Sequence, residues 1–411
     1  MSTGYRPRAP PPLPDPVPYD PCIELTITAG EVLLYRVLDV ADQADLAAAE
    51  RILRARAHAG GGVGGGVARL ALGRQRQAVA FTNPPVVAHL GERVVRVGGR
   101  DLPATARTQL YDFGAMTVVW SLPITPGMSL AELAELSADL NEPSLQAEIW
   151  GWLDDDASLM VETIGAALVA PTAPTRPAQR RSGPHAEDLV LYAVRGFDQP
   201  VTAEELLADP LLAQLLLGER HTYSKQLIGE LHRTSYSYSS SDLVVIGYDQ
   251  AFVLDEEPGD VAALLEFSLA QVLELEGYDA LLDERLAQMT DTISSRRAQV
   301  GQFGIGRSRF ETTRRDLLLQ HVDLTEVLER VTSSVKVTED LYYAKIYRGA
   351  LDLFGAAELI TSTDRKLELM FRTYTMLADE VDSHTTHRLE WIVILLIGFE
   401  IVITLIEKIW R

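Results

Sequence analysis

Over residues 23–257, short apolar runs alternate with segments that repeat every three or four positions, a pattern typical of strands mixed with helices. Strands are predicted at Val32–Val40, 77–82, 93–97, 111–123, 188–197 and 242–257. Helices are predicted at 41–59, 129–140, 142–168 and 202–218. We therefore expect a compact α+β domain. One alternative is that this domain consists of two related halves.

Two Pro-rich segments interrupt this pattern. Residues 1–22 hold many prolines and no apolar run, which predicts a disordered tail without a secretory signal. Residues 170–186 are rich in Pro and Arg and predict a loop within the domain.

From residue 258 onward the pattern is helical, with helices expected at about 260–298, 309–337, 339–358 and 363–409. Residues 258–388 are thus predicted to form a helical stalk. Apolar and aromatic residues follow each other at spacings of three and four in the last helix, as in a coiled coil. This seam comprises Leu367, Met370, Tyr374, Leu377, Val381, His384, Arg388 and Trp391. It either packs within the chain or joins copies of it into a homo-oligomer.

Residues 389–411 are predicted to form a single transmembrane helix. Between Ile392 and Ile406 only Glu400 and Thr404 break an apolar run. Trp391 and Trp410 flank this run about 28 Å apart at ~1.5 Å per residue, close to the thickness of a bilayer core. We expect a tail anchor in the cytoplasmic (inner) membrane, with the body in the cytoplasm; a buried helix of a soluble bundle is the alternative.

Glu400 is the main candidate site residue. An ionised carboxylate facing lipid costs at least ~2.5 kcal/mol, so Glu400 is expected to be protonated or buried against another helix. A hydrogen bond to Thr404 of a neighbouring copy is one arrangement, and Arg388, Trp391 and Trp410 are the other expected membrane or oligomer contacts. A snorkelling side chain and an ion-conducting role are alternatives.

The net charge of the chain argues against two classes of binding partner. The 411-residue chain carries a formal charge of −21, which opposes direct binding to nucleic acid or to anionic lipid. Cys22 is the single cysteine, so an intramolecular disulfide and a Cys-based zinc site are excluded. No catalytic constellation is found, so we expect a non-enzymatic protein without a cofactor; an enzyme with an unrecognised site is a rival.

Three weaker motifs can be explained by ordinary structural roles without a binding site. Glu380, His384 and His387 share a helical face that can bind a metal, although such residues often only solvate a juxtamembrane turn. The glycine run in Ala59–Leu70 lacks the Lys-Ser/Thr of a phosphate loop and predicts a flexible loop. Six acids of the 260–298 helix predict a solvated face, or alternatively a cation-lining surface: Glu266, Glu274, Glu276, Asp279, Asp283 and Glu284.

Two segments carry a family resemblance. "HRLEWIVILLIGFEIVITL" (387–405) and "DFGAMTVVWSLP" (112–123) resemble the required-for-meiotic-nuclear-division family, which has a domain of unknown function. The resemblance implies a bacterial, membrane-anchored, self-associating member that tethers translation-related machinery, with lipid, itself and a ribosome-associated protein as partners. We therefore expect a membrane scaffold. The rival is an accessory subunit of an ion-transport pathway, with the stalk-and-span outline of CorA-type transporters.

Overall fold

The computed structural model describes residues 24–58, 66–69, 81, 83–171, 186–221, 223–298, 338, 340–373, 396–398 and 400. The predictions for the Pro-rich tail, for most of the strand at 77–82, for the helix at 309–337 and for most of the 170–186 loop lie outside these residues. So do most of the glycine run and most of the predicted membrane anchor.

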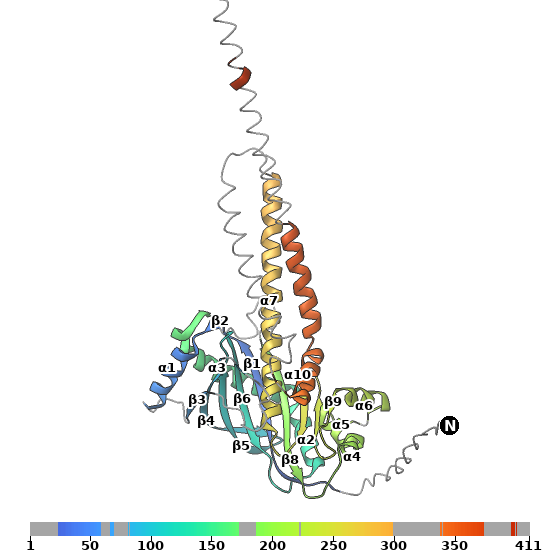
Figure 1. The fold of residues 1–411 in the computed structure, drawn as a ribbon. Coiled ribbons are helices and arrows are strands. Elements are labelled where there is room, and N and C mark those ends of the chain that lie inside the picture. The colour runs from blue at the N-terminus through green and yellow to red at the C-terminus, as the bar shows by residue number, and fades with distance from the viewer. Residues whose placement is uncertain are drawn as a thin grey trace, which may run out of the picture.

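A mixed sheet of nine strands forms the centre of the body (Figure 1). Its order is β3 (Val67–Arg69), β4 (Val86–Val97), β5 (Arg100–Leu110), β6 (Ala115–Pro123), β1 (Ile27–Asp39), β8 (Ala186–Phe197), β11 (Gln250–Leu254), β10 (Leu243–Ile246) and β9 (Ser235–Tyr236). Neighbouring strands are antiparallel except β8 and β11, which are parallel. β2 (Ala41–Ala44) and β7 (Leu168–Pro171) form a separate antiparallel pair. The predicted α+β class is confirmed.

The central strand β1 is apolar on both faces because helices cover both faces of the sheet. In β1, Tyr35 lies opposite Val119 of β6 and Leu189 of β8. Successive side chains point to opposite faces of a strand, so Leu34 enters one core and Tyr35 the other. This two-sided burial explains why apolar residues occupy successive positions of β1 at Val32–Tyr35 and again at Val37–Leu38.

Different helices build the two cores. On the Leu34 side lie α1 (Leu46–His58), α2 (Leu130–Leu140), α3 (Pro143–Ile164), α4 (Ala203–Ala208) and α5 (Pro210–Leu217). On the Tyr35 side lie α7 (Gly259–Ala298) and α10 (Leu341–Leu353). The shorter elements are α6 (Lys225–Leu231) and the 3-10 turns Gly165–Ala167 and His232–Thr234. The body therefore has three layers, with the sheet in the middle.

Several predicted elements of the body differ from the structure. The helix expected over 202–218 is two helices, α4 and α5, which are separated at Asp209. The helix expected over 41–59 begins only at Leu46, because Ala41–Ala44 pairs with β7 as strand β2. Asp45 caps the helix by accepting a hydrogen bond from the Ala48 backbone N–H at 2.9 Å. The predicted strand at 242–257 is a hairpin of β10 and β11.

The helix α7 projects well beyond the body (Figure 1). Its 40 residues give it a length of roughly 60 Å at ~1.5 Å per residue. A further helix, residues 356–373, continues from α10 along the stalk and lies beside α7. The break between α10 and this helix is at Gly355, whose φ of 83° suits glycine, a few residues before the predicted break.

In the part of the chain that the structure describes, no helix has both the length and the apolar character needed to cross a bilayer.

Candidate functional site

The helix α7 and the α10–(356–373) segment run side by side in the same direction. Near the sheet, the rings of Phe267 and Tyr347 stack with centroids 6.1 Å apart. Farther along both helices, the Ser362 hydroxyl donates a hydrogen bond to Asp279 at 2.8 Å. The residue numbers of both partners rise together, so the two helices are parallel and form the described part of the stalk.

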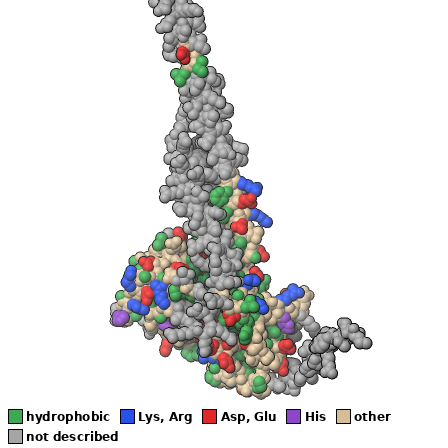
Figure 2. All heavy atoms as spheres, viewed as in Figure 1, with side chains coloured by type: hydrophobic (Ala, Val, Ile, Leu, Met, Phe, Trp, Pro, Cys, Tyr) green, Lys and Arg blue, Asp and Glu red, His purple; other side chains and the backbone are tan. Residues whose placement is uncertain are grey.

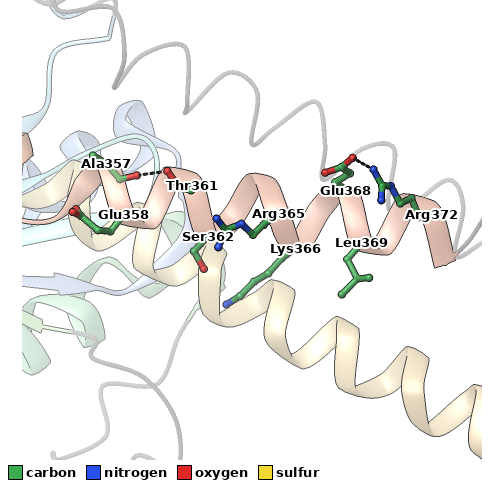
Figure 3. A pocket seen from close by; sticks show the side chains of 9 residues that line it. All are labelled: Ala357, Glu358, Thr361, Ser362, Arg365, Lys366, Glu368, Leu369 and Arg372. Atoms are coloured by element: carbon green, nitrogen blue, oxygen red, sulfur yellow. Dashed lines mark hydrogen bonds and ion pairs between the residues drawn. The ribbon is translucent and has the colours of Figure 1, made fainter.

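Lys366 joins the two stalk helices. Its Nζ lies 2.8 Å from a carboxylate oxygen of Asp279 and 2.7 Å from one of Asp283, and Figure 3 shows it pointing toward α7. Burial opposes the charge, but the two carboxylates outweigh it and raise the pKa of Lys366. Beside this ion-pair group, Leu367 and Met370 pack on Leu282. The first two positions of the predicted seam therefore contact the same chain.

A groove runs along the 356–373 helix, and Ser362 and Lys366 are part of its lining (Figure 3). It has a volume of about 770 Å³ and a mixed lining: Ala357, Glu358, Thr361, Ser362, Arg365, Lys366, Glu368, Leu369 and Arg372. Leu369 is 54% exposed beside the Glu368–Arg372 ion pair. Figure 2 shows apolar, acidic and basic side chains close together on this part of the stalk. The groove thus offers both apolar and charged contacts.

A buried ion pair holds α7 on the sheet. Nη2 of Arg107 in β5 donates to Oε2 of Glu266 in α7 at 2.9 Å, and the Glu266 side chain is 1% exposed. Burial and the charge of Glu266 both raise the pKa of the nearby Tyr35. The predicted solvated face of α7 is therefore wrong at Glu266. The spacing of the acids along α7 gave no sign of this, because the partner comes from a strand about 160 residues earlier.

Glu276 lies where α7 leaves the body. Its Oε2 is buried and has no hydrogen-bond partner among the described residues. Burial, followed by the charges of Glu187 and Asp279, raises the pKa of Glu276 to about 7.

Replacing Glu276 by glutamine should therefore stabilise the protein at high pH. The folded state holds this proton more tightly than the unfolded chain, so the stability from Glu276 is lost as pH rises from 4.5 to about 7. Urea titrations should show Glu276→Gln more stable than the wild type by on the order of 1–2 kcal/mol at pH 8, with little difference at pH 4. The exposed Glu148→Gln is the matched control. A difference in stability between Glu276→Gln and the wild type that does not change with pH would contradict the raised pKa of Glu276.

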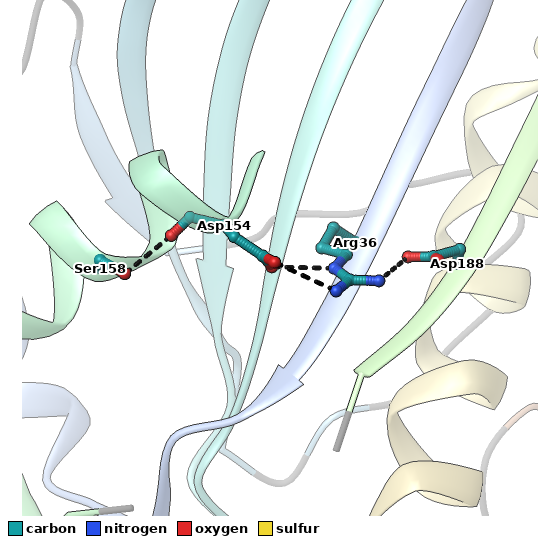
Figure 4. A network of polar contacts seen from close by, with 4 residues as sticks. All are labelled: Arg36, Asp154, Ser158 and Asp188. Atoms are coloured by element: carbon teal, nitrogen blue, oxygen red, sulfur yellow. Dashed lines mark hydrogen bonds and ion pairs between the residues drawn. The ribbon is translucent and has the colours of Figure 1, made fainter. Parts of the chain in front are cut away.

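Between α3 and the sheet, Arg36 joins two carboxylates (Figure 4). Its Nε and Nη2 donate to Asp154 of α3 at 2.9 and 3.2 Å, and its Nη1 donates to Asp188 of β8 at 2.6 Å. Burial raises the pKa of Asp188 and Arg36 opposes this, while Asp154 and Asp249 add to the increase. One guanidinium thus faces an excess of carboxylates.

Asp188 also lines a pocket of about 280 Å³. The other lining residues are Leu140, Asn141, Gln146, Trp150, Val190, Asp249 and Gln250. They come from the end of α2, from the α2–α3 connection, from the first half of α3, from β8, and from β11 with the turn before it. Sequence reasoning missed this pocket because its members are far apart along the chain.

Few of the predicted site residues fall within the described part of the chain. Glu400 is helical and exposed, next to the exposed Leu396 and Ile397. Outside the described residues lie Thr404, Trp391, Trp410, Arg388 and the weak metal candidates Glu380, His384 and His387. Among the residues that are described, no group of three or more His, Cys, Asp or Glu side chains can hold a metal ion.

Residues 29–262 match the family model described as "Uncharacterized protein MJ0711, N-terminal domain", and this match covers more than half of the chain. The chain belongs to this family. Uncharacterized protein MJ0711 of the archaeon Methanocaldococcus jannaschii is 25% identical over 197 residues, which are 47% of this chain and 59% of that relative. The chain therefore spans less than two thirds of the relative's length. No solved structure matches the chain.

The family match overturns the resemblance to the required-for-meiotic-nuclear-division family. The segment that carried most of that resemblance, 387–405, lies outside the matched residues 29–262. The other segment, 112–123, includes β6, whose Val and Trp residues follow from burial between two helical layers. The burial of β6 is an apolar environment that many unrelated proteins share.

Proposed function

We propose that this protein is a non-enzymatic scaffold that holds its α+β body away from a membrane. In this arrangement, residues 389–411 form a single membrane-spanning anchor at the cytoplasmic membrane, and the body lies in the cytoplasm. The body is carried on the parallel helix pair and works as a homo-oligomer.

The observation that carries the proposal is the stalk. The helix 356–373 leaves the body in the same direction as α7 (Figure 1), and the apolar run Ile392–Ile406 follows it in sequence. Lys366 fixes this helix to α7 with two ion pairs. The described end of this helix therefore lies far from the sheet, as an anchor on a spacer requires.

The partner that we propose for the scaffold is a second copy of this chain. The translation-related and ribosome-associated partners depended on the resemblance that the family match overturns, so we do not propose them. Self-association has independent support from the exposed Leu369 in the stalk groove and from the polar Glu400 within the apolar run.

Deleting residues 389–411 should release the protein from membranes, because it removes the apolar surface that would enter the bilayer. After a carbonate wash, we expect the full chain in the membrane pellet and the truncated chain in the supernatant. The detergent-solubilised full chain should sediment as an oligomer.

Two point variants distinguish membrane insertion of the apolar run from nonspecific adsorption of the protein to membranes. Ile397→Arg places a charge in the apolar run and should weaken retention in the pellet. Leu369→Arg removes an equally exposed apolar side chain from the stalk and should leave retention unchanged. Complete extraction of the full chain by carbonate would refute the proposed anchor.

A further inference from the structure

The pocket beside Arg36 has the form of a small-molecule site. Its volume of about 280 Å³ is near the lower end of the ~300–1,000 Å³ range typical of ligand pockets. It belongs to the body, far from the stalk, and the proposed scaffold role makes no use of it. We therefore infer the class of ligand that it binds from its lining residues alone.

Hydrogen bonds fix the polar wall of the pocket. Gln250 is 5% exposed, and its side-chain oxygen accepts a hydrogen bond from the Ser137 hydroxyl at 3.0 Å. Asn141 donates to the Gly218 carbonyl at 3.2 Å. Since these amides are held by the surrounding structure, the wall is formed before any ligand arrives, which lowers the entropic cost of binding.

The charges of the pocket select a cation. None of the eight described residues that line it is basic, while Asp188 and Asp249 are acidic. The nearby guanidinium of Arg36 is already bound by both Asp154 and Asp188. The only charged side chains that an anion would meet in this lining are carboxylates, and a neutral ligand would leave the excess negative charge uncompensated.

The rest of the lining favours an organic cation over a metal ion. Trp150 contributes an aromatic wall, and Leu140 and Val190 contribute apolar surface. A divalent metal such as calcium needs six or more oxygen ligands, whereas an ammonium group needs only a few acceptors and is attracted to an aromatic face.

We propose that this pocket binds a small aliphatic amine, with its ammonium group near Asp188 and Asp249 and its hydrocarbon chain against Trp150. The amides of Asn141, Gln146 and Gln250 supply further polar contacts at the walls. The site lies between the helical layer and the sheet, so an occupied pocket joins the α2–α3 connection to β8 and β11.

Calorimetric titration of the full chain tests this site. The probe is 1,4-diaminobutane, with 1,4-butanediol as a neutral analogue of the same length and succinate as an anionic one. We expect heat of binding from the diamine and none from the diol or from succinate. Equal binding of diol and diamine, or no binding of diamine up to millimolar concentration, would overturn the proposal. So would displacement of the diamine by magnesium chloride at equal concentration.

Variants assign the binding to this pocket. Asp249→Asn should weaken binding of the diamine about tenfold, because a charge-assisted hydrogen bond becomes neutral. Trp150→Leu should weaken it by a similar factor through loss of the aromatic face. Asp155→Asn, an exposed change on the same α3 helix, should leave the affinity within about twofold of the wild type.

Asp249 is exposed in the turn before β11, so its substitution leaves the fold intact even if the Trp150 variant is unstable. The backbone carbonyl of Asp249, which accepts a hydrogen bond from the Val190 N–H at 2.9 Å, is unchanged in that variant. Wild-type affinity in Asp249→Asn would place the amine elsewhere and refute the site.

Discussion

Replacing Gly114 by alanine should destabilise the protein by more than about 4 kcal/mol or prevent it from folding. Gly114 has a φ of 89°, and a Cβ built on it would lie 1.7 Å from the backbone carbonyl oxygen of Ala41. Ala41 cannot retreat easily, because it begins strand β2 and pairs with Pro171 of β7. The Gly114 carbonyl also accepts a hydrogen bond from the Val40 N–H at 3.1 Å, so the turn is held on both sides.

Gly127→Ala separates the clash from the backbone strain. Gly127 has a nearly identical φ of 90°, but an added Cβ would meet nothing within 4 Å. This variant should therefore lose only the ~1–2 kcal/mol that the left-handed conformation costs. Soluble yield and urea unfolding followed by circular dichroism measure both variants. If the two alanine variants unfold within about 1 kcal/mol of each other, the close approach of Ala41 does not decide the stability.

Replacing Glu266 by alanine should lower the free energy of unfolding by about 3 kcal/mol. Arg107 would then keep a largely buried positive charge, 27% exposed, without the carboxylate that lies 2.9 Å away. Breaking a buried ion pair by removing one partner is costly because the remaining charge loses its compensation. Urea unfolding at pH 7 provides the measurement.

Two further variants test this explanation. The double variant Arg107→Met/Glu266→Leu should recover most of the loss, because apolar side chains of similar volume can replace a buried ion pair. The exposed Glu148→Ala on α3 should change the stability by less than about 0.5 kcal/mol. A double variant as unstable as Glu266→Ala alone would show that packing, and not the unpaired charge, causes the loss.

The α+β class and most long elements of the body could be predicted from the sequence. Strands such as Val32–Val40 are mostly apolar, and α2 begins with the capping pair Ser129 and Glu132. Such signals are local, so they can be recognised in the sequence without knowledge of the tertiary structure. The hairpin of β4 and β5 was harder to predict, because β5 carries many polar residues and Gly91 and Glu92 interrupt the apolar pattern of β4.

The sites were harder to predict because their parts meet only in the fold. Arg36, Asp154 and Asp188 come from a strand, a helix and another strand that are more than 30 residues apart at every step. No spacing rule connects such residues. The acids of α7 illustrate the same limit, since Glu266 and Asp279 look alike in sequence but bind Arg107 and Lys366 in different parts of the structure.

The position of β1 in the middle of the sheet has a consequence for synthesis on the ribosome. This strand is among the first parts of the body to be made, yet its partners are Ala115–Pro123 and Ala186–Phe197. At roughly 5–20 residues per second, translation needs on the order of ten seconds or more before the second partner exists. During that interval a strand that is apolar on both faces has two open edges. The nascent β1 strand must therefore be kept from contact with other apolar surfaces until β8 has emerged from the ribosome.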